Sequence, residues 1–133
     1  MTDGSAAAAE MAARLAELTE AGCWEWQILV FADERLQLIG GGDMDYSHDT
    51  EAAFHGVTFI SCPTRMKHPR FRLATEHETL VSGAYAALEP GAVVVAIEGD
   101  AINDFDRTWF ITARSVEVKR GLFRHAPTGG TSA

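Results

Sequence analysis

One stretch of the chain is apolar at every position and is bounded on both sides by polar or turn-forming residues. Residues Ala92–Ile97 read Ala-Val-Val-Val-Ala-Ile, which is typical of a strand buried on both faces at the centre of a sheet. Pro90-Gly91 precedes this run as a turn signal, and the polar residues Glu98–Asp106 follow it. The strand-like residues Arg107–Lys119 then return along the chain. We therefore expect an antiparallel hairpin at the centre of the fold.

The returning strand changes the face that its apolar residues occupy. Trp109 and Ile111 share one side of an extended chain, whereas Val116 and Val118 have the opposite parity. A regular strand cannot change its buried face in this way. The pattern therefore predicts a bulge near Ala113–Ser115.

Alternating apolar and polar residues predict further strands on both sides of this centre. One side of the segment Trp24–Phe31 carries Trp24, Trp26, Ile28 and Val30, and the end of the segment is apolar on both sides. Turn-like residues Ala32–Arg35 and a second strand-like arm follow, which predicts a hairpin. We expect Gly40-Gly41-Gly42 to interrupt the pattern, Asp43–Asp49 to form a loop and Thr64–Pro69 to form a basic linker. Further strands are predicted at Glu51–Phe54, Val57–Ser61 and Arg70–Thr75, with a bulge favoured over a tight turn at His55-Gly56.

Two segments have helical periodicity. In Ser5–Ala21 an apolar stripe of Met11, Leu15 and Leu18 predicts an amphipathic helix, with Ser5 as its N-cap and Gly22 just beyond its C-terminus. The second helix begins where Thr75 and Glu78 have the spacing of a capping box. The apolar residues that give it helical spacing are Val81, Ala84, Tyr85 and Leu88, and Glu89-Pro90-Gly91 ends it.

These patterns predict an α+β protein. We expect a twisted or partly rolled antiparallel sheet of five to seven strands, covered by the N-terminal helix and the second helix. With 133 residues the chain has the length of one domain, which we place at residues 1–125, followed by a loose C-terminal tail at 126–133.

The charge balance narrows the choice of partners. The 19 acidic and 11 basic residues give a formal net charge of −8, which argues against nucleic-acid binding because phosphate neutralisation depends on Lys and Arg. No apolar run approaches the roughly 20 residues that cross a bilayer, so we expect no membrane association. Cys23 and Cys62 occur without a secretory signal, which indicates a cytoplasmic protein with reduced thiols, although a bridge between them stays open. The oligomeric state is open too, and a homo-oligomeric structural protein that pairs through an exposed strand or helix is a third possible class.

No motif in the chain specifies catalysis, a cofactor or a metal. The five histidines lack zinc-ligand spacing, and neither a phosphate-binding loop nor a nucleophile elbow is present. The segment from Asp43 resembles the start of an EF-hand loop, but His48 stands where that loop needs glycine and Phe54 where it needs glutamate. A solvated acidic loop is the better interpretation. We expect a binding protein rather than an enzyme.

Two sets of residues are candidate sites. The first is a pair of acidic connections that would form a recognition surface for a basic protein partner: Asp43, Asp45, Asp49 and Glu51, with Asp100, Asp104 and Asp106. The alternative is a pocket for a small ligand, or an unrecognised enzyme site, lined by the aromatic residues Trp24, Trp26, Tyr85 and Trp109. Aromatic residues on one face of a strand belong more often to a core.

A motif in the middle of the chain resembles one in a diffuse group of small bacterial proteins. In that group an acidic or histidine-containing loop precedes a strand of the form Phe-x-Gly-Val-x-Phe/Tyr-Ile, here Phe54-His55-Gly56-Val57-Thr58-Phe59-Ile60. The resemblance extends over about Trp24–Lys119. Some members resemble immunity proteins, which neutralise a toxin by binding it. The resemblance therefore implies an immunity-type inhibitor of a basic toxin, and it implies no catalytic residue.

Overall fold

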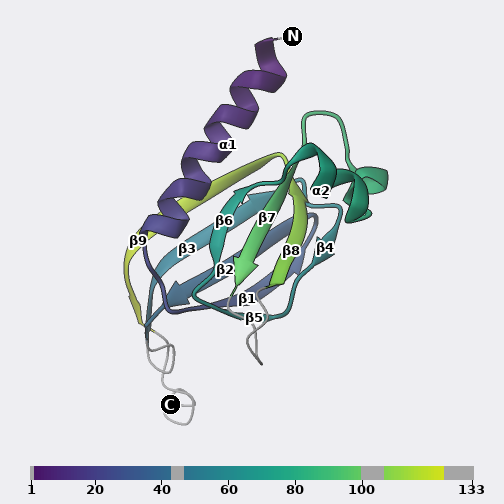
Figure 1. Cartoon of the computed structure of the whole chain (residues 1–133). Coiled ribbons are helices and arrows are strands. Elements are labelled where there is room, and N and C mark those ends of the chain that lie inside the picture. The colour runs from purple at the N-terminus through teal and green to yellow at the C-terminus, as the bar shows by residue number, and fades with distance from the viewer. Residues whose placement is uncertain (1, 43–46, 100–106, 125–133) are drawn as a thin grey trace.

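The computed structural model describes residues 2–42, 47–99 and 107–124 (Figure 1). Its helices are α1 (Thr2–Glu20), α2 (Glu76–Val81) and the 3₁₀ helix η1 (Ala84–Ala87). Its strands are β1 (Glu25–Ala32), β2 (Arg35–Gly41), β3 (Ser47–His55), β4 (Ile60–Ser61), β5 (Arg65–Lys67), β6 (Arg70–Leu73), β7 (Val93–Gly99), β8 (Arg107–Ala113) and β9 (Ser115–Arg124).

The strands form two antiparallel sheets. The five-stranded sheet has the order β5-β1-β2-β3-β9, and the four-stranded sheet has the order β4-β8-β7-β6. The predicted α+β class is therefore confirmed, and so is the central hairpin, in which β7 pairs with β8 from Val93↔Ala113 to Gly99↔Arg107. The expected five to seven strands in one sheet were too few. The short strand β5 has no alternation that sequence could reveal, and Arg107–Lys119 divides into β8 and β9. The predicted strand Val57–Ser61 is present only as β4, Ile60–Ser61.

A two-stranded ribbon bends at one corner and joins the two sheets. β3 pairs with β9 as far as His55↔Ser115, and beyond the bend β4 pairs with β8 at Ile60↔Ile111. The Arg114 N–H donates to His55 O over 2.7 Å at the corner itself. The bulges predicted at His55-Gly56 and Ala113–Ser115 are therefore both wrong in kind: at each place the chain changes sheet, as strands do at the corners of orthogonally packed sheets.

Glycine is required on the inside of this corner. Gly56 has φ of 70°, and a Cβ there would lie 2.8 Å from Cγ of Arg114. The same corner explains the parity change noted in the sequence. Ile111 and Val116 both reach the common core, but from different sheets.

Helix α1 lies across the edge strands β6 and β9, where the two sheets would otherwise be open to solvent (Figure 1). Its predicted stripe of Met11, Leu15 and Leu18 is fully buried. The Thr19 hydroxyl accepts the Phe71 N–H (2.8 Å) and donates to Phe71 O (3.2 Å), which fixes the end of the helix to β6. Gly22 follows with φ of 66°, as predicted. Ser5 is not the N-cap, because the helix begins at Thr2.

The β1–β2 hairpin is confirmed, with Asp33 and Glu34 at positive φ (53° and 61°) in a two-residue turn. Two details differ from expectation. The strand β2 continues through Gly40 and Gly41 instead of ending before them. Glycine is needed at position 40 because the backbone there lies against the ring of buried Trp26, and a larger residue would collide with it. Residues Leu29–Phe31 are exposed instead of buried on both faces, since this end of β1 extends beyond both β5 and the core.

The capping box at the start of α2 is confirmed. Thr75 Oγ1 accepts the Glu78 N–H (3.1 Å), and Glu78 Oε1 accepts the Thr75 N–H (2.9 Å). The predicted continuation of this helix to Leu88 is wrong. Gly83 adopts φ of 86°, which ends α2, and the next turn is the 3₁₀ helix η1. The segment Thr64–Pro69 is not a plain linker either, because β5 pairs with β1 inside it.

Gly40 should tolerate no side chain. A Cβ on Gly40 would lie 2.7 Å from Cδ2 of Trp26, whereas a Cβ on Gly42 would meet no atom within 4 Å. We expect Gly40→Ala to lower the free energy of unfolding by about 1–3 kcal/mol, through displacement of the indole in a filled core, and Gly42→Ala to leave it nearly unchanged. Urea denaturation of the two variants measures the difference. Equal stabilities would contradict the close contact between Gly40 and Trp26.

The Glu78 carboxylate should stabilise the fold in a pH-dependent way. Arg72 donates to both Glu78 oxygens (2.7 and 2.8 Å), and these bonds lower the pKa of Glu78 from 4.5 to about 2. The stabilisation is therefore complete above pH 4.5 and is lost as the pH falls through 2. Glu78→Gln keeps a side-chain acceptor for the cap but removes the charge. At pH 7 it should cost about 1–2 kcal/mol, since the pair is partly screened by solvent.

Denaturation at several pH values tests this expectation, with Glu76→Gln as the control in the same helical turn. The difference between wild type and Glu78→Gln should shrink toward zero near pH 2. A difference that stays constant with pH would show that the charge of Glu78 does not contribute.

Candidate functional site

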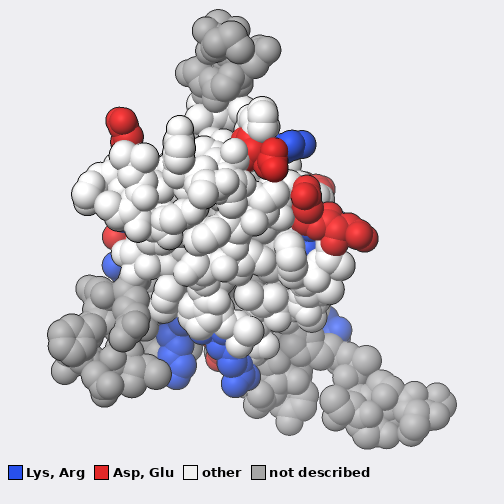
Figure 2. Space-filling model, turned by 90° about the vertical axis from the view of Figure 1, so that its right-hand side faces the viewer, with Lys and Arg blue, Asp and Glu red and all other residues white. Residues whose placement is uncertain are grey.

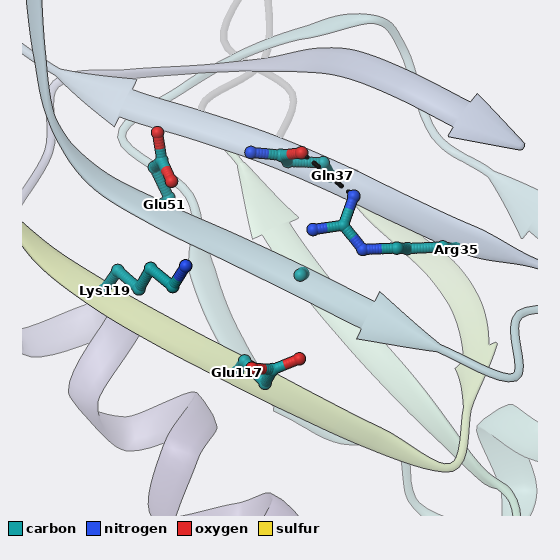
Figure 3. A pocket seen from close by; sticks show the side chains of 6 residues that line it. Arg35, Gln37, Glu51, Glu117 and Lys119 are labelled. Carbon is teal, nitrogen blue, oxygen red and sulfur yellow. Dashed lines mark hydrogen bonds between the residues drawn. The ribbon is translucent and has the colours of Figure 1, made fainter. Parts of the chain in front are cut away.

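The outer face of the five-stranded sheet carries a polar depression. Six residues line it: Arg35 and Gln37 from β2, Glu51 and Ala53 from β3, and Glu117 and Lys119 from β9 (Figure 3). The register places them on one face, because Gln37 and Glu117 both pair with Ala53, and Lys119 pairs with Glu51. Ala53 is shorter than its neighbours on both sides. The depression therefore lies over Ala53.

Charges of both signs surround this depression. In Figure 3 the side chains of Arg35 and Lys119 extend toward each other over it, while Glu51 and Glu117 lie at its rim. Arg35 Nη1 donates to Gln37 Oε1 (3.0 Å), and Glu117 Oε1 lies 2.6 Å from Nε2 of His55. The volume is about 60 Å³. This is room for about two water molecules, whereas sites for small molecules span roughly 300–1,000 Å³.

Only two of the predicted acidic contact residues lie in the described part of the chain. Asp43, Asp45, Asp100, Asp104 and Asp106 lie outside it, as does the predicted tail 126–133. Glu51 lies in a strand, β3, as predicted. Asp49 lies in the same strand and not in the expected loop Asp43–Asp49, because β3 begins at Ser47.

Asp49 and Glu51 have different surroundings. Asp49 is exposed and accepts the Thr50 hydroxyl at 2.9 Å. Glu51 is half-buried and lies 2.8 Å from Nε2 of His48, whose ring stacks on Phe123 with 5.0 Å between centroids. Asp49 is therefore available to a partner, whereas Glu51 is already engaged in the contacts of its own face.

The strand ends that bound the two acidic connections lie at the same end of the molecule. β2 and β7 both end at the lower end in Figure 1, and β3 and β8 both begin there. The connections between these strands carry five aspartates and neither Lys nor Arg at positions 43–46 and 100–106. Two segments that are more than 50 residues apart in sequence are thus flanked by strand ends at the same end of the molecule.

The four aromatic residues of the alternative site do not share a pocket. Trp26 is fully buried and packs edge-on against Phe71, with 5.4 Å between centroids. Trp24 and Tyr85 are more than half exposed, the former beside His68 and the latter on η1. Trp109 packs against the core from β8. None of the four lines the depression of Figure 3.

Both cysteines are free. Burial raises the pKa of each thiol from 9.0 to about 11. The Cys23 sulfur lies 3.4 Å from both Asp49 Oδ1 and Thr50 Oγ1. At neutral pH both groups are therefore protonated thiols, which are poor nucleophiles and poor metal ligands.

Residues 2–42, 47–99 and 107–124 contain no group of three or more His, Cys, Asp or Glu side chains that could hold a metal ion. Within the same ranges no helix is long and apolar enough to cross a membrane.

Sequence reasoning missed two surface features that depend on which faces the fold covers. One is the polar depression itself, whose residues come from three strands. The other is a set of exposed apolar side chains, which the sequence pattern assigned to buried faces: Leu29, Val30, Phe31 and Val81. Figure 2 looks at the molecule from the right-hand side of Figure 1, where α2 and β4 lie, and shows a broad face with few charged residues.

No protein-family model, curated protein or solved structure matches the chain. The resemblance to immunity-type proteins therefore stays a prediction, as do the function and the partner that it implies.

The two thiols should react slowly with alkylating reagents. With a pKa of about 11, only about one thiol in a thousand is ionised at pH 8. We expect the rate of alkylation by iodoacetamide, followed at each cysteine by peptide mass spectrometry, to rise about tenfold for each pH unit up to pH 10. The urea-unfolded chain is the control. If either cysteine in the folded chain were alkylated at pH 7 as fast as in unfolded chain, it would be a reactive nucleophile.

Proposed function

We propose that this chain is a non-enzymatic binding protein that binds a basic protein partner through the acidic connections at one end of its two sheets. The proposal rests on one observation: the strands that flank residues 43–46 and 100–106 end or begin at the same end of the molecule. Exposed Asp49, two residues into β3, extends the same acidic region into the described part of the chain.

The negative charge of the two segments favours the binding of a positively charged partner. Five carboxylates without a neighbouring Lys or Arg in those two segments produce a local negative potential, which attracts a cationic surface and raises the association rate. The remaining surface differs, since many of its carboxylates are paired: Glu17 with Arg14, Glu25 with Arg65, Glu78 with Arg72 and Glu117 with His55. The two segments, in contrast, contain five aspartates and neither Lys nor Arg.

The resemblance of Phe54–Ile60 to a motif of small bacterial proteins supports a more specific form of the proposal. In that form the chain is an immunity-type inhibitor of the bacterial cytoplasm, and it neutralises a basic toxin by covering its cationic surface. Small ligands have less support as targets, because the depression of Figure 3 has a volume of about 60 Å³ and the four candidate aromatic residues lie apart.

Removal of charge from one connection tests the proposal. The immobilised chain should capture a basic protein from a lysate of its own source, and the complex should weaken as salt screens the charges. We expect the triple variant Asp100→Asn, Asp104→Asn and Asp106→Asn to reduce the affinity for the captured protein by about tenfold or more, as measured by calorimetry.

A control variant of equal net charge separates a local effect from a general one. Glu20, Glu76 and Glu89 are exposed, and no ion pair involves them in the described residues. Their replacement by Gln removes three negative charges elsewhere and should leave the affinity nearly unchanged. If both triple variants weakened binding equally, or if the complex were insensitive to salt, the proposed surface would be wrong.

A further inference from the structure

The last residues of β1 form an unprotected sheet edge. β1 pairs with β2 from Glu25 to Ala32, with a register shift at Leu29, but with β5 only from Glu25 to Gln27. The Ile28 N–H still donates to Thr64 O (2.8 Å), and beyond it no strand of the described chain pairs with that side of β1. The free edge is therefore Leu29–Ala32.

Apart from a register shift against β2 at Leu29, this edge lacks the devices that usually protect an edge strand. Charged residues, prolines or a covering segment keep most edges from pairing with another chain. Here the residues are Leu-Val-Phe-Ala, and Leu29, Val30 and Phe31 are 55%, 42% and 48% exposed. Such a segment exposes both apolar side chains and unpaired backbone groups to water.

The direction of the free backbone groups follows from the hairpin turn. Ala32 and Arg35 flank the two-residue turn and close it as a hydrogen-bonded pair, so the backbone groups of Ala32 face β2. Successive residues of a strand direct these groups to opposite sides, so the N–H and C=O of Phe31 point away from β2 toward the free edge. Phe31 therefore offers one donor and one acceptor to an incoming antiparallel strand.

We propose that this edge binds a second copy of the same chain, through antiparallel pairing of the two Leu29–Ala32 segments about a two-fold axis at Phe31. Phe31 of each copy then exchanges both backbone hydrogen bonds with Phe31 of the other. The two phenyl rings lie on the same face as a cross-strand aromatic pair. Val30 of one copy faces Ala32 of the other, and the two five-stranded sheets become continuous.

Charge complementarity at both ends of the paired segment favours a second copy as the occupant. In this register Asp33 of one copy lies opposite Leu29 of the other. In that other copy Arg65 pairs with Gln27, two residues before Leu29. The positions of Asp33 and Arg65 along the edge are therefore about 7 Å apart. The acidic turn Asp33-Glu34 thus meets the basic strand β5, whose Arg65 side chain is 73% exposed. The two-fold axis repeats this contact at the opposite end. This pairing does not depend on the acidic connections, so it is independent of the proposed function.

The mass in solution and its dependence on concentration test the proposal. Light scattering and sedimentation over roughly a hundredfold range of concentration should show the 14.4 kDa chain in equilibrium with twice that mass. Hydrogen exchange at the Phe31 amide should slow as the concentration rises. A single species at monomer mass throughout, or a Phe31 amide that exchanges equally fast at all concentrations, would overturn the proposal.

Matched variants locate the contact. Phe31→Lys places a charge on the edge and should raise the dimer dissociation constant about tenfold or more. The control Val81→Lys adds the same charge at another exposed apolar position, on α2, and should leave that constant unchanged. Arg65→Glu and Glu34→Lys should each weaken the dimer, and the double variant should restore it. A dimer that Phe31→Lys does not weaken would overturn the proposal, as would a double variant weaker than both single ones.

Discussion

The bend shared by β3–β4 and β9–β8 determines the rest of the architecture. A strand with alternating apolar and polar residues has one apolar face, and a second layer of structure must cover that face to bury it. Here the second layer is made by the same two strands after they turn at His55-Gly56 and Arg114. Backbone pairing continues on both sides of the turn, and Gly56 gives the Arg114 side chain the space to pass. The two sheets therefore enclose one core, and α1 covers the side that they leave open.

The surfaces available for binding follow from this arrangement. The inner faces are occupied by the core, so polar residues of β2, β3 and β9 gather on the outer face around the depression of Figure 3. The strands that flank the two acidic connections end or begin at the same end of the molecule (Figure 1). The β1–β2 hairpin extends beyond the core, which leaves Leu29–Phe31 in solvent. The proposed binding of a partner by the acidic connections and the proposed self-pairing of the β1 edge involve different parts of the chain, and one does not exclude the other.

Local patterns gave correct predictions where the interacting residues are close together in the sequence. The capping box of Thr75 and Glu78, the stripe of Met11, Leu15 and Leu18, and the two-residue turn at Asp33-Glu34 each involve residues within one turn or hairpin. The pattern at Tyr85 and Val81 failed because a left-handed Gly83 separates them, so that their helical spacing never forms one face. The candidate site was only partly predictable: Asp49 and Glu51 share a strand, but no sequence pattern could show that His48 engages one of them.

The sequence alone determined most of the elements, the α+β class, the central β7–β8 hairpin and the excess of negative charge, since periodicity, caps and composition are local properties. Only the tertiary structure decided that Ala113–Ser115 is a change of sheet instead of a bulge, that Gly40 belongs to a strand, and that an apolar segment ends in solvent. Each of these depends on a partner distant in sequence: His55 for Arg114, Trp26 for Gly40, and the early end of β5 for Leu29–Phe31. A periodic pattern records that a face prefers burial, but it does not record whether another part of the chain covers that face.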